Sequence, residues 1–304
     1  MPSTRIPWIV AAFASFLICA SGQASPAPTG PKVYIPFFAN DGHDKPILDV
    51  TQADVAILDN KKPPQSVLGM RTAAELPLRL GVLINTSGSE RLSGLYQIEV
   101  EAASEFLTRV LNGTEDRAFV ENFGAVPHAT QFLTKAELRA VKLDVTPAGP
   151  SAFYDAIRFA CEERMEKDPL HAARRIIVLV GDGHDNASQI DQGKAIASAQ
   201  EAGAVVFLVS TLDDPRAPSQ RRNGALKEFA DQTGGAVFLQ LTRKDIPNVF
   251  ATIREQIDNM RVLSYVPAGP LQDGQRRPIE LKPASSRKLK IRAPKAYYLT
   301  ATTQ

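Results

Sequence analysis

Residues 76–90 read Leu-Pro-Leu-Arg-Leu-Gly-Val-Leu-Ile-Asn-Thr-Ser-Gly-Ser-Glu, so an apolar run gives way abruptly to short polar side chains. The run at 80–84 is almost continuously apolar, which is typical of a strand buried on both faces of a parallel sheet. A second run at 176–180 ends in the same manner, with Gly-Asp-Gly-His-Asp-Asn at 181–186. In open α/β sheets, ligands bind beyond the carboxyl ends of the strands. Two strands that end in hydroxyls and carboxylates at one edge therefore predict a hard-cation site.

Apolar runs alternate with amphipathic helical patterns between residues 76 and 262. This alternation predicts a doubly wound α/β domain, with a mainly parallel sheet and helices on both faces. Strands are expected at 80–84, 117–123, 129–132, 176–180, 205–210 and 236–239. Helices are expected at 91–111, 151–167, 190–202 and 225–232, and after an N-cap at Asp245. We expect strand 80–84 to lie centrally, beside strand 176–180.

Two shorter β-rich segments flank this domain, a small N-terminal unit at 33–72 and a C-terminal extension at 263–304. Both consist of short strand-like runs separated by turn residues. A unit of about forty residues buries little apolar surface alone. We therefore expect the two segments to dock on one another or on the sheet domain.

The first 24 residues predict a secretory signal peptide. Arg5 precedes an apolar run at 6–20, and small residues suited to cleavage follow. Residues 25–32 then read as a linker rich in Pro, Ala, Ser and Gly. An uncleaved anchor is an alternative, although the run is short for a membrane span, and lipidation at Cys19 is disfavoured by Ile18 before it. We expect a secreted or periplasmic protein with no membrane span after cleavage.

The composition excludes some classes of partner. The formal net charge is +2 with both signs interspersed, and no basic block indicates nucleic acid binding. After signal cleavage Cys161 is the one remaining cysteine, so no intramolecular disulfide is expected. Its place on an apolar helix face with Phe153 and Ile157 predicts a buried small hydrophobe and not a reactive thiol.

The polar residues after the two apolar runs resemble the motifs of the von Willebrand factor type A domain. That family carries D-x-S-x-S after its first strand and T-D-G, or a variant, after its fourth; here Asn85-Thr86-Ser87-Gly88-Ser89 and Asp182 stand at those places. Residues 149–157, Gly-Pro-Ser-Ala-Phe-Tyr-Asp-Ala-Ile, are similar to the family's G-G-T-x-L-Y-D-A-I and put Ser151 at its threonine. The resemblance implies a metal-ion-dependent adhesion site (MIDAS) formed by Asn85, Ser87, Ser89, Ser151 and Asp182 in one polar cleft.

The flanking segments resemble the leader and tail of a bacterial, acidobacteria-type subgroup of this family (VWFA-related). The similar stretches are 42–46, 48–55 and 59–63 in the leader, and 265–267, 273–277 and 288–298 in the tail. The family resemblance implies a non-catalytic, adhesion-type protein-binding module, in which an acidic side chain of the partner completes the coordination of Mg²⁺ or Mn²⁺.

Asn85 departs from the family pattern, because the family has aspartate there. An amide oxygen accepts hydrogen bonds but brings no charge. Asp182 is then the one charge at a matched position; Asp155 and Asp185 could add to it, or are explained as a polar helix residue and a loop cap. The sequence leaves two interpretations open, a weakened Mg²⁺ or Mn²⁺ site and a degenerate site whose serines only form turns and caps. In the second case the chain is a metal-independent structural or assembly component.

The sequence predicts no enzyme. Ser87, His184 and either Asp182 or Asp185 could form a catalytic group, but the chain has no G-x-S-x-G elbow and His184 is equally well explained as an exposed loop residue. The remaining histidines lack the spacing of zinc ligands. No glycine-rich nucleotide loop is present either, so no nucleotide is expected.

Overall fold

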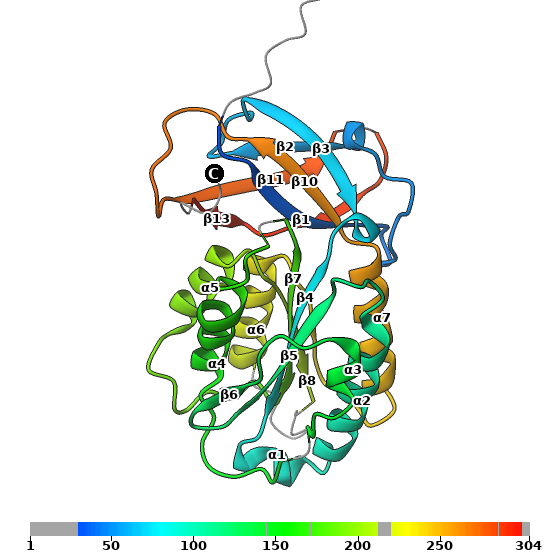
Figure 1. Ribbon diagram of the computed structural model, residues 1–304, viewed down its shortest axis with the longest axis vertical. Coiled ribbons are helices and arrows are strands. Elements are labelled where there is room, and N and C mark those ends of the chain that lie inside the picture. Colours follow the sequence, from blue (N-terminus) through cyan, green and yellow to red (C-terminus); the bar gives the residue numbers. More distant parts are fainter. Residues whose placement is uncertain (1–29, 144, 171, 212–219, 285, 300–304) are drawn as a thin grey trace, which may run out of the picture.

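The computed structural model describes residues 30–143, 145–170, 172–211, 220–284 and 286–299. Its larger part is a layered domain, in which helices cover both faces of a sheet with strand order β6-β5-β4-β7-β8-β9 (Figure 1). The strands are β4 (Leu78–Asn85), β5 (Arg117–Phe123), β6 (Pro127–Ala129), β7 (Arg174–Gly181), β8 (Val205–Ser210) and β9 (Val237–Phe238). The predicted α/β fold class is confirmed.

Strand β4 lies inside the sheet, parallel to β5 on one side and to β7 on the other. Leu80 is opposite Ala118 of β5 and Ile176 of β7. Every residue of β4 is buried, as its apolar run predicts. β7, β8 and β9 continue the parallel pairing, whereas β6 is antiparallel at one edge. The expected central position of residues 80–84, beside 176–180, is confirmed.

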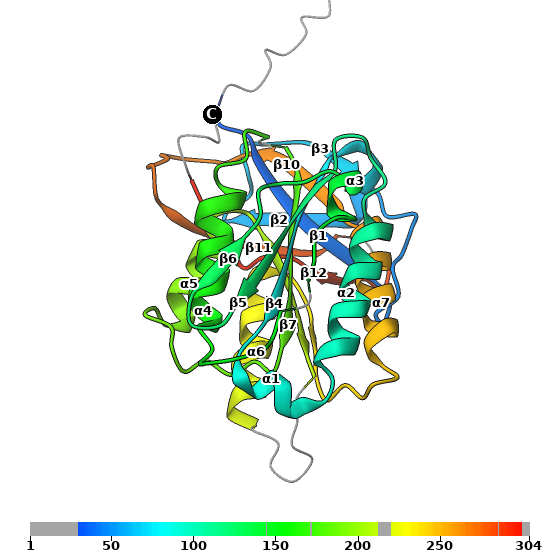
Figure 2. The same cartoon turned by 60° about the horizontal axis from the view of Figure 1, so that its bottom comes forward.

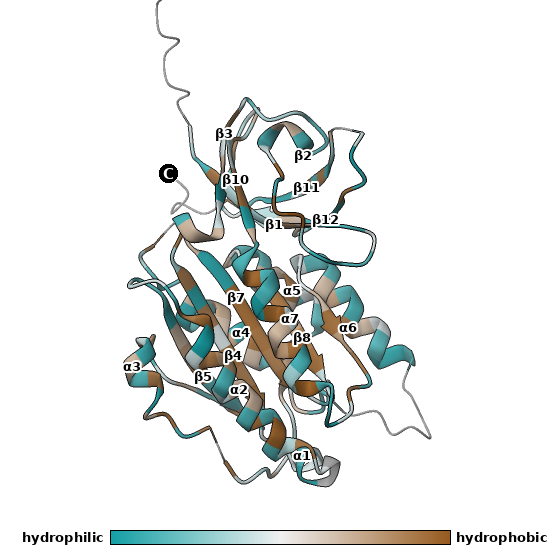
Figure 3. Cartoon of the chain, turned by 90° about the vertical axis from the view of Figure 1, so that its right-hand side faces the viewer, coloured by the Kyte–Doolittle hydropathy of each residue, from teal (hydrophilic) through white to brown (hydrophobic). Residues whose placement is uncertain are grey.

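The two faces of β4 pack against different helices. Leu80 and Val82 belong to the core shared with α2 (Tyr96–Val110) and α7 (Ile246–Asp258). Leu83 belongs to the opposite core, which the other large helices cover: α4 (Phe153–Ala160), α5 (Gln192–Glu201) and α6 (Gln220–Thr233). Figure 2 shows these two helix layers on either side of the sheet, and Figure 3 shows the largely hydrophobic strands between them.

Two of the expected helices differ from the prediction. The helix expected at 91–111 is divided into α1 (Gly88–Ser93) and α2, because Gly94 caps α1 with a left-handed backbone, φ +67°. The helix expected at 151–167 begins with α4 and continues as a π-helical turn, Cys161–Met165. Cys161 is fully buried there, as predicted. A short helix, α3 (Lys135–Leu138), was not predicted.

Strands from both ends of the chain combine into two small sheets, which we call the β module. The sheets have the orders β12-β1-β10-β3 and β13-β11-β2. Their strands are β1 (Val33–Asn40), β2 (Val55–Asp59), β3 (Ser66–Thr72), β10 (Arg261–Val266), β11 (Arg276–Pro283), β12 (Lys290–Arg292) and β13 (Ala296–Tyr298), with 3-10 turns at Gln52–Asp54 and Ala73–Glu75. β1 pairs with β10 and β2 with β11, so the N- and C-terminal segments dock on one another. The module lies at the end of the main sheet where β4 and β7 begin (Figure 1).

One buried carboxylate connects the two sheets of the β module. Asp59 accepts hydrogen bonds at Oδ2 from the hydroxyls of Tyr265 (3.1 Å) and Tyr297 (2.8 Å). Its Oδ1 accepts from Arg277 Nε at 2.8 Å. Burial raises the pKa of both tyrosines, so their hydroxyls remain protonated donors. The four residues come from β2, β10, β13 and β11, which explains how segments far apart in sequence form one unit.

The predicted signal peptide at 1–24, and the linker up to residue 29, lie outside the described residues. Across the part of the chain that the structure does describe, no helix combines the length and apolar character needed to cross a bilayer.

A candidate cation site at the carboxyl edge of the sheet

The five residues predicted to form the metal site lie on three loops at the carboxyl edge of the sheet. This edge is beside α1, at the end opposite the β module (Figures 1 and 2). Asn85 ends β4, Ser87 is the N-cap of α1, Ser89 lies in the first turn of α1, and Asp182 follows β7. Ser151 precedes Ala152, the N-cap of α4. We call these five residues the carboxyl-edge site.

Backbone hydrogen bonds hold the Ser151 loop between the other two. Gly88 N donates to Gly149 O at 2.8 Å, which joins the middle loop to the turn after β4. Asn186 N donates to Ser151 O at 2.9 Å, and Ser151 N donates to Asn186 Oδ1 at 2.8 Å. The structure therefore brings together the three loops on which the site residues lie.

Asn85 is the centre of the site's hydrogen bonds. Its Nδ2 donates to Asp182 Oδ1 at 3.1 Å and to Glu90 Oε1 at 3.0 Å, while its Oδ1 accepts from Ser87 N at 2.9 Å. The close approach of β7 depends on Gly181, because a Cβ there would lie 2.5 Å from Asn85 Cβ. The amide of Asn85 thus acts as a donor to two carboxyl groups, a role that an aspartate could not fill.

The two serines of the first loop have their hydroxyls side by side, with Ser87 Oγ 3.0 Å from Ser89 Oγ. Two oxygens on neighbouring corners of an octahedron with metal–oxygen bonds of about 2.1 Å lie about 3.0 Å apart. The serine pair therefore fits one edge of a Mg²⁺ coordination shell. Ser87 is buried and Ser89 is partly exposed, so the expected cleft is largely closed and Ser89 is its most accessible oxygen.

Two further oxygens of the site are buried without a hydrogen-bond partner among the described residues, Asp182 Oδ2 and Ser151 Oγ. Buried polar atoms of this kind are uncommon in native proteins and often mark a place for an ion or water. No three His, Cys, Asp or Glu side chains in the described ranges form a group that could hold a metal. The oxygens available to a cation at this edge are therefore the serine hydroxyls and the Asp182 carboxylate.

Two buried glutamates that the sequence analysis missed lie at the site, Glu90 and Glu99. Burial, then the nearby carboxyls of Glu99 and Asp182, raise the pKa of Glu90 to about 9. Burial raises the pKa of Glu99, the Thr211 hydroxyl lowers it and Asp182 raises it by less, so that it stands at about 7. Glu99 follows Leu95 by four residues and precedes Phe106 by seven, so its position on the apolar face of α2 was the available signal.

The other acidic residues considered from the sequence have local roles. Asp155 Oδ2 accepts from Gln189 N at 2.9 Å, and Asp185 Oδ1 accepts from Phe153 N at 2.9 Å. Both bonds fasten the loop after β7 to the first turn of α4. The ring of exposed His184 lies 2.5 Å from Arg222, while the Ser87 hydroxyl contacts Ser89. Neither of these contacts joins a serine to a histidine.

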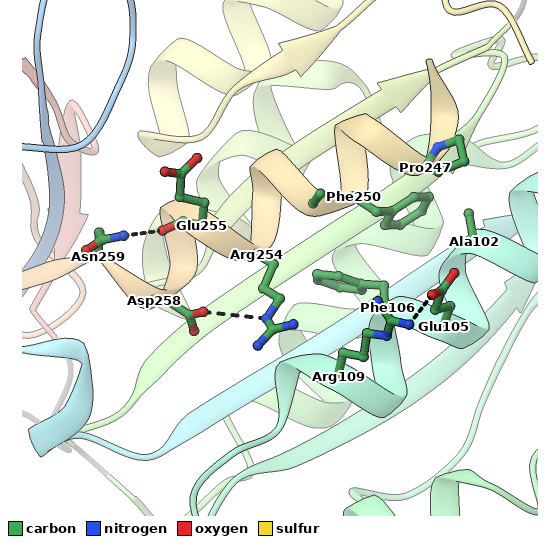
Figure 4. A pocket seen from close by; sticks show the side chains of 11 residues that line it. Ala102, Glu105, Phe106, Arg109, Pro247, Phe250, Arg254, Glu255, Asp258 and Asn259 are labelled. Carbon is green, nitrogen blue, oxygen red and sulfur yellow. Dashed lines mark hydrogen bonds and ion pairs between the residues drawn. The ribbon is translucent and has the colours of Figure 1, made fainter. Parts of the chain in front are cut away.

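A separate groove lies between α2 and α7 and has a volume of about 450 Å³. Figure 4 shows Phe106 and Phe250 between the two helices, with ion pairs of Arg109 with Glu105 and of Arg254 with Asp258. None of the five residues of the carboxyl-edge site lines this groove.

No protein-family model matches the sequence, and no curated protein matches it. Solved structures do match. Proximal thread matrix protein 1 from the mussel byssus, with a zinc-occupied MIDAS motif, matches at a TM-score of 0.50 and 14% identity, over 64% of this chain and 48% of that chain. The pilus adhesin SpaC from Lactobacillus rhamnosus GG matches at a TM-score of 0.50 and 9% identity, over 87% of this chain and 49% of that chain. A von Willebrand factor type A structure from Catenulispora acidiphila has a TM-score of 0.49 and 12% identity, and the match covers 91% of this chain and 76% of that chain.

The chain spans about half the length of the matrix protein and of the adhesin. At these identities the likeness establishes the fold: the sheet domain has the von Willebrand factor type A fold, as the sequence motifs predicted. The resemblance to the acidobacteria-type subgroup stays a prediction.

Proposed function

We propose that this chain is a secreted or periplasmic, non-catalytic module that binds another protein through the carboxyl-edge site. The observation that carries the proposal is the pair of buried oxygens without partners, Asp182 Oδ2 and Ser151 Oγ, on loops that hydrogen bonds hold together. The fold shared with a pilus adhesin and with a matrix protein that has a MIDAS motif supports the same class of function.

In this proposal Ser87, Ser89, Ser151 and Asp182 hold Mg²⁺ or Mn²⁺. The bound cation supplies an open coordination position to a carboxylate of the partner. Ser89, as the partly exposed member, marks the side from which the partner approaches. The site is weaker than one with aspartate at position 85, because the amide brings no charge and its nitrogen donates to Asp182.

One observation favours a second function, that of a metal-independent scaffold. The Asn85 amide forms hydrogen bonds with both neighbouring carboxyl groups and with Ser87 N, so protein contacts alone connect the ends of β4 and β7. In that case the fold is used for assembly, and surfaces such as the β module make the contacts.

Selection from a random peptide library displayed on phage separates the two functions. The proposal predicts that peptides selected on the full chain in Mn²⁺ contain Asp or Glu, and that EDTA and Asp182→Ala both abolish their binding. The matched control is Asp49→Ala, which removes an exposed carboxylate of the β module and should leave binding unchanged. Peptide binding that survives both EDTA and Asp182→Ala would assign the chain to the scaffold class.

A further inference from the structure

Exposed basic side chains lie around α1, the helix that carries Ser89. Arg91 is exposed in this helix, two residues after Ser89. Arg243, in the loop after β9, donates from Nη2 to Gly94 O at 2.9 Å, so this loop lies beside the end of α1. Lys244 follows it, and both side chains are exposed. Three cations are thus placed next to the first loop of the carboxyl-edge site.

A fourth cation lies at the start of α6, at the same end of the sheet as α1 (Figure 2). Arg221 is exposed in the first turn of this helix. The next residue, Arg222, has Nη1 2.5 Å from His184 Nε2, and His184 N donates to Asp182 Oδ1 at 3.0 Å. These contacts connect the start of α6 to the Asp182 loop. We use the name basic rim for four residues, Arg91, Arg221, Arg243 and Lys244.

The exposed charge of these segments has one sign. Within the part of the chain that the structure describes, no residue of the basic rim forms an ion pair with an acidic side chain. Elsewhere exposed cations have such partners, for example Lys290 with Asp44 at 2.6 Å. The acidic residues of the same segments are directed to the protein, because Glu90 is buried and Asp245 accepts from Thr242 N at 2.8 Å. Positive charges of this kind beside a binding site favour a negatively charged partner.

The flank of the site toward β5 presents apolar side chains. Val126, in the turn after β5, is 60% exposed, and Val145, in the loop that leads to Ser151, is 40% exposed. Ala152 N donates to Gly124 O at 2.8 Å, so the turn after β5 packs against the Ser151 loop. Because β5 lies on one side of β4, and β8 and β9 lie on the other, the two surfaces flank the site. A segment that spans the site meets apolar surface at one end and cations at the other.

We propose that the partner segment bound at the carboxyl-edge site carries several acidic side chains, of which one reaches the cation and the others contact the basic rim. The inference deepens the proposed function, on which it rests. A protein segment fits this surface better than a nucleic acid does, because exposed Val126 and Val145 interrupt the positive charge on the β5 side. Charges at the edge of an interface act mainly on the association rate and on its dependence on salt.

Parallel selections from a random peptide library displayed on phage test the inference. They use the full wild-type chain and the double variant Arg91→Glu/Lys244→Glu, both in MnCl₂. We expect the wild type to select peptides with several Asp or Glu residues, and the variant to select peptides with fewer. A labelled synthetic copy of the most enriched wild-type peptide is then the probe for fluorescence anisotropy. Either single reversal should weaken its binding by about tenfold at low salt, and the difference should shrink as NaCl is added.

Variants of matched charge separate the effect of the rim from general changes. Arg91→Lys and Lys244→Arg keep the positive charge and should bind the probe as the wild type does. Lys288→Glu reverses an exposed cation of the β module, at the opposite end of the sheet, and should also leave binding unchanged. Thermal melts verify that each variant folds, and Arg221→Glu on α6 replaces any reversal that prevents folding.

The possible outcomes distinguish the inference from the proposed function. Equal binding of the probe by wild type and both reversals would overturn the inference alone, as would selection of peptides with a single acidic residue on both proteins. Acidic peptides that the reversals weaken, but that still bind in EDTA and to Asp182→Ala, would support the rim and overturn the cation site. A wild type that selects no peptide would overturn both, and rim-dependent binding of a labelled DNA duplex in place of acidic peptides would show that the proposed partner class is wrong.

Discussion

The Asn85 side-chain amide donates a hydrogen bond to the Asp182 carboxylate over 3.1 Å and so joins the carboxyl ends of β4 and β7. The resembling family has aspartate at this position, which can only accept. The substitution therefore reverses the direction of the hydrogen bonding at the site, in addition to removing a charge. We therefore expect the stability of the site and its affinity for a cation to depend on the same residue.

Asn85→Asp should make the stability of the chain depend on a divalent cation. In EDTA the variant places a third carboxyl group beside Glu90 and Asp182 and loses both Nδ2 donors, which we expect to cost about 1–3 kcal/mol. Mn²⁺ should restore much of that loss, because a ligand that binds only the folded state stabilises it. Thermal melts of wild type and variant in EDTA and in MnCl₂ measure the effect. Identical melting temperatures of the variant in the two buffers would contradict it.

Asp59 should be essential to the β module. Asp59→Ala leaves the buried Arg277 guanidinium without its carboxylate and is expected to cost about 3–5 kcal/mol. Tyr297→Phe removes a single hydrogen bond to Asp59 and should cost about 1 kcal/mol. Urea denaturation of both variants gives the two free energies of unfolding. Similar, small losses would show that the carboxylate does not hold the N- and C-terminal strands together.

Glu121 on β5 should make the wild type less stable as the pH rises. Its carboxyl group is 0% exposed, and its two oxygens have no hydrogen-bond partner within the described residues. Burial raises its pKa well above 4.5, so the folded state binds this proton more tightly than the unfolded state does. The difference in the free energy of unfolding, wild type minus Glu121→Gln, should therefore fall as the pH rises above 4.5.

Urea denaturation of the two proteins over a series of pH values measures this difference. Arg164 is the charged neighbour that lowers the pKa of Glu121, and it is present in both proteins. A difference that is constant or increases with pH would contradict the raised pKa.

The sheet and the position of the site could be predicted because their signals are local. Continuous apolar runs at 80–84 and 176–180 specify strands buried on both faces, and the polar residues after them mark the shared edge. The break at Gly94 could not be predicted, since both halves have a helical pattern and the glycine was compatible with one continuous helix. The π-helical turn at Cys161–Met165 likewise leaves the apolar face of the sequence intact.

The charges of the site were harder to predict than its location. The lost charge at Asn85 can be read from the sequence, whereas its role as a donor depends on tertiary contacts with Glu90 and Asp182. Glu99 carried a visible signal, a charged residue on the apolar face of a helix, and its contact with the site depends on tertiary structure. Asp185 caps the first turn of α4, and Asp155 accepts from the loop after β7, a tertiary contact that its place inside a helix does not predict.

Anomalous diffraction from crystals soaked in MnCl₂ tests the central claim most directly. We expect one manganese peak bounded by Ser87 Oγ, Ser89 Oγ and Asp182, and no peak there in crystals of Asp182→Ala soaked in the same way. Absence of manganese from this position at saturating MnCl₂, with the Asn85–Asp182 hydrogen bond unchanged, would contradict the account.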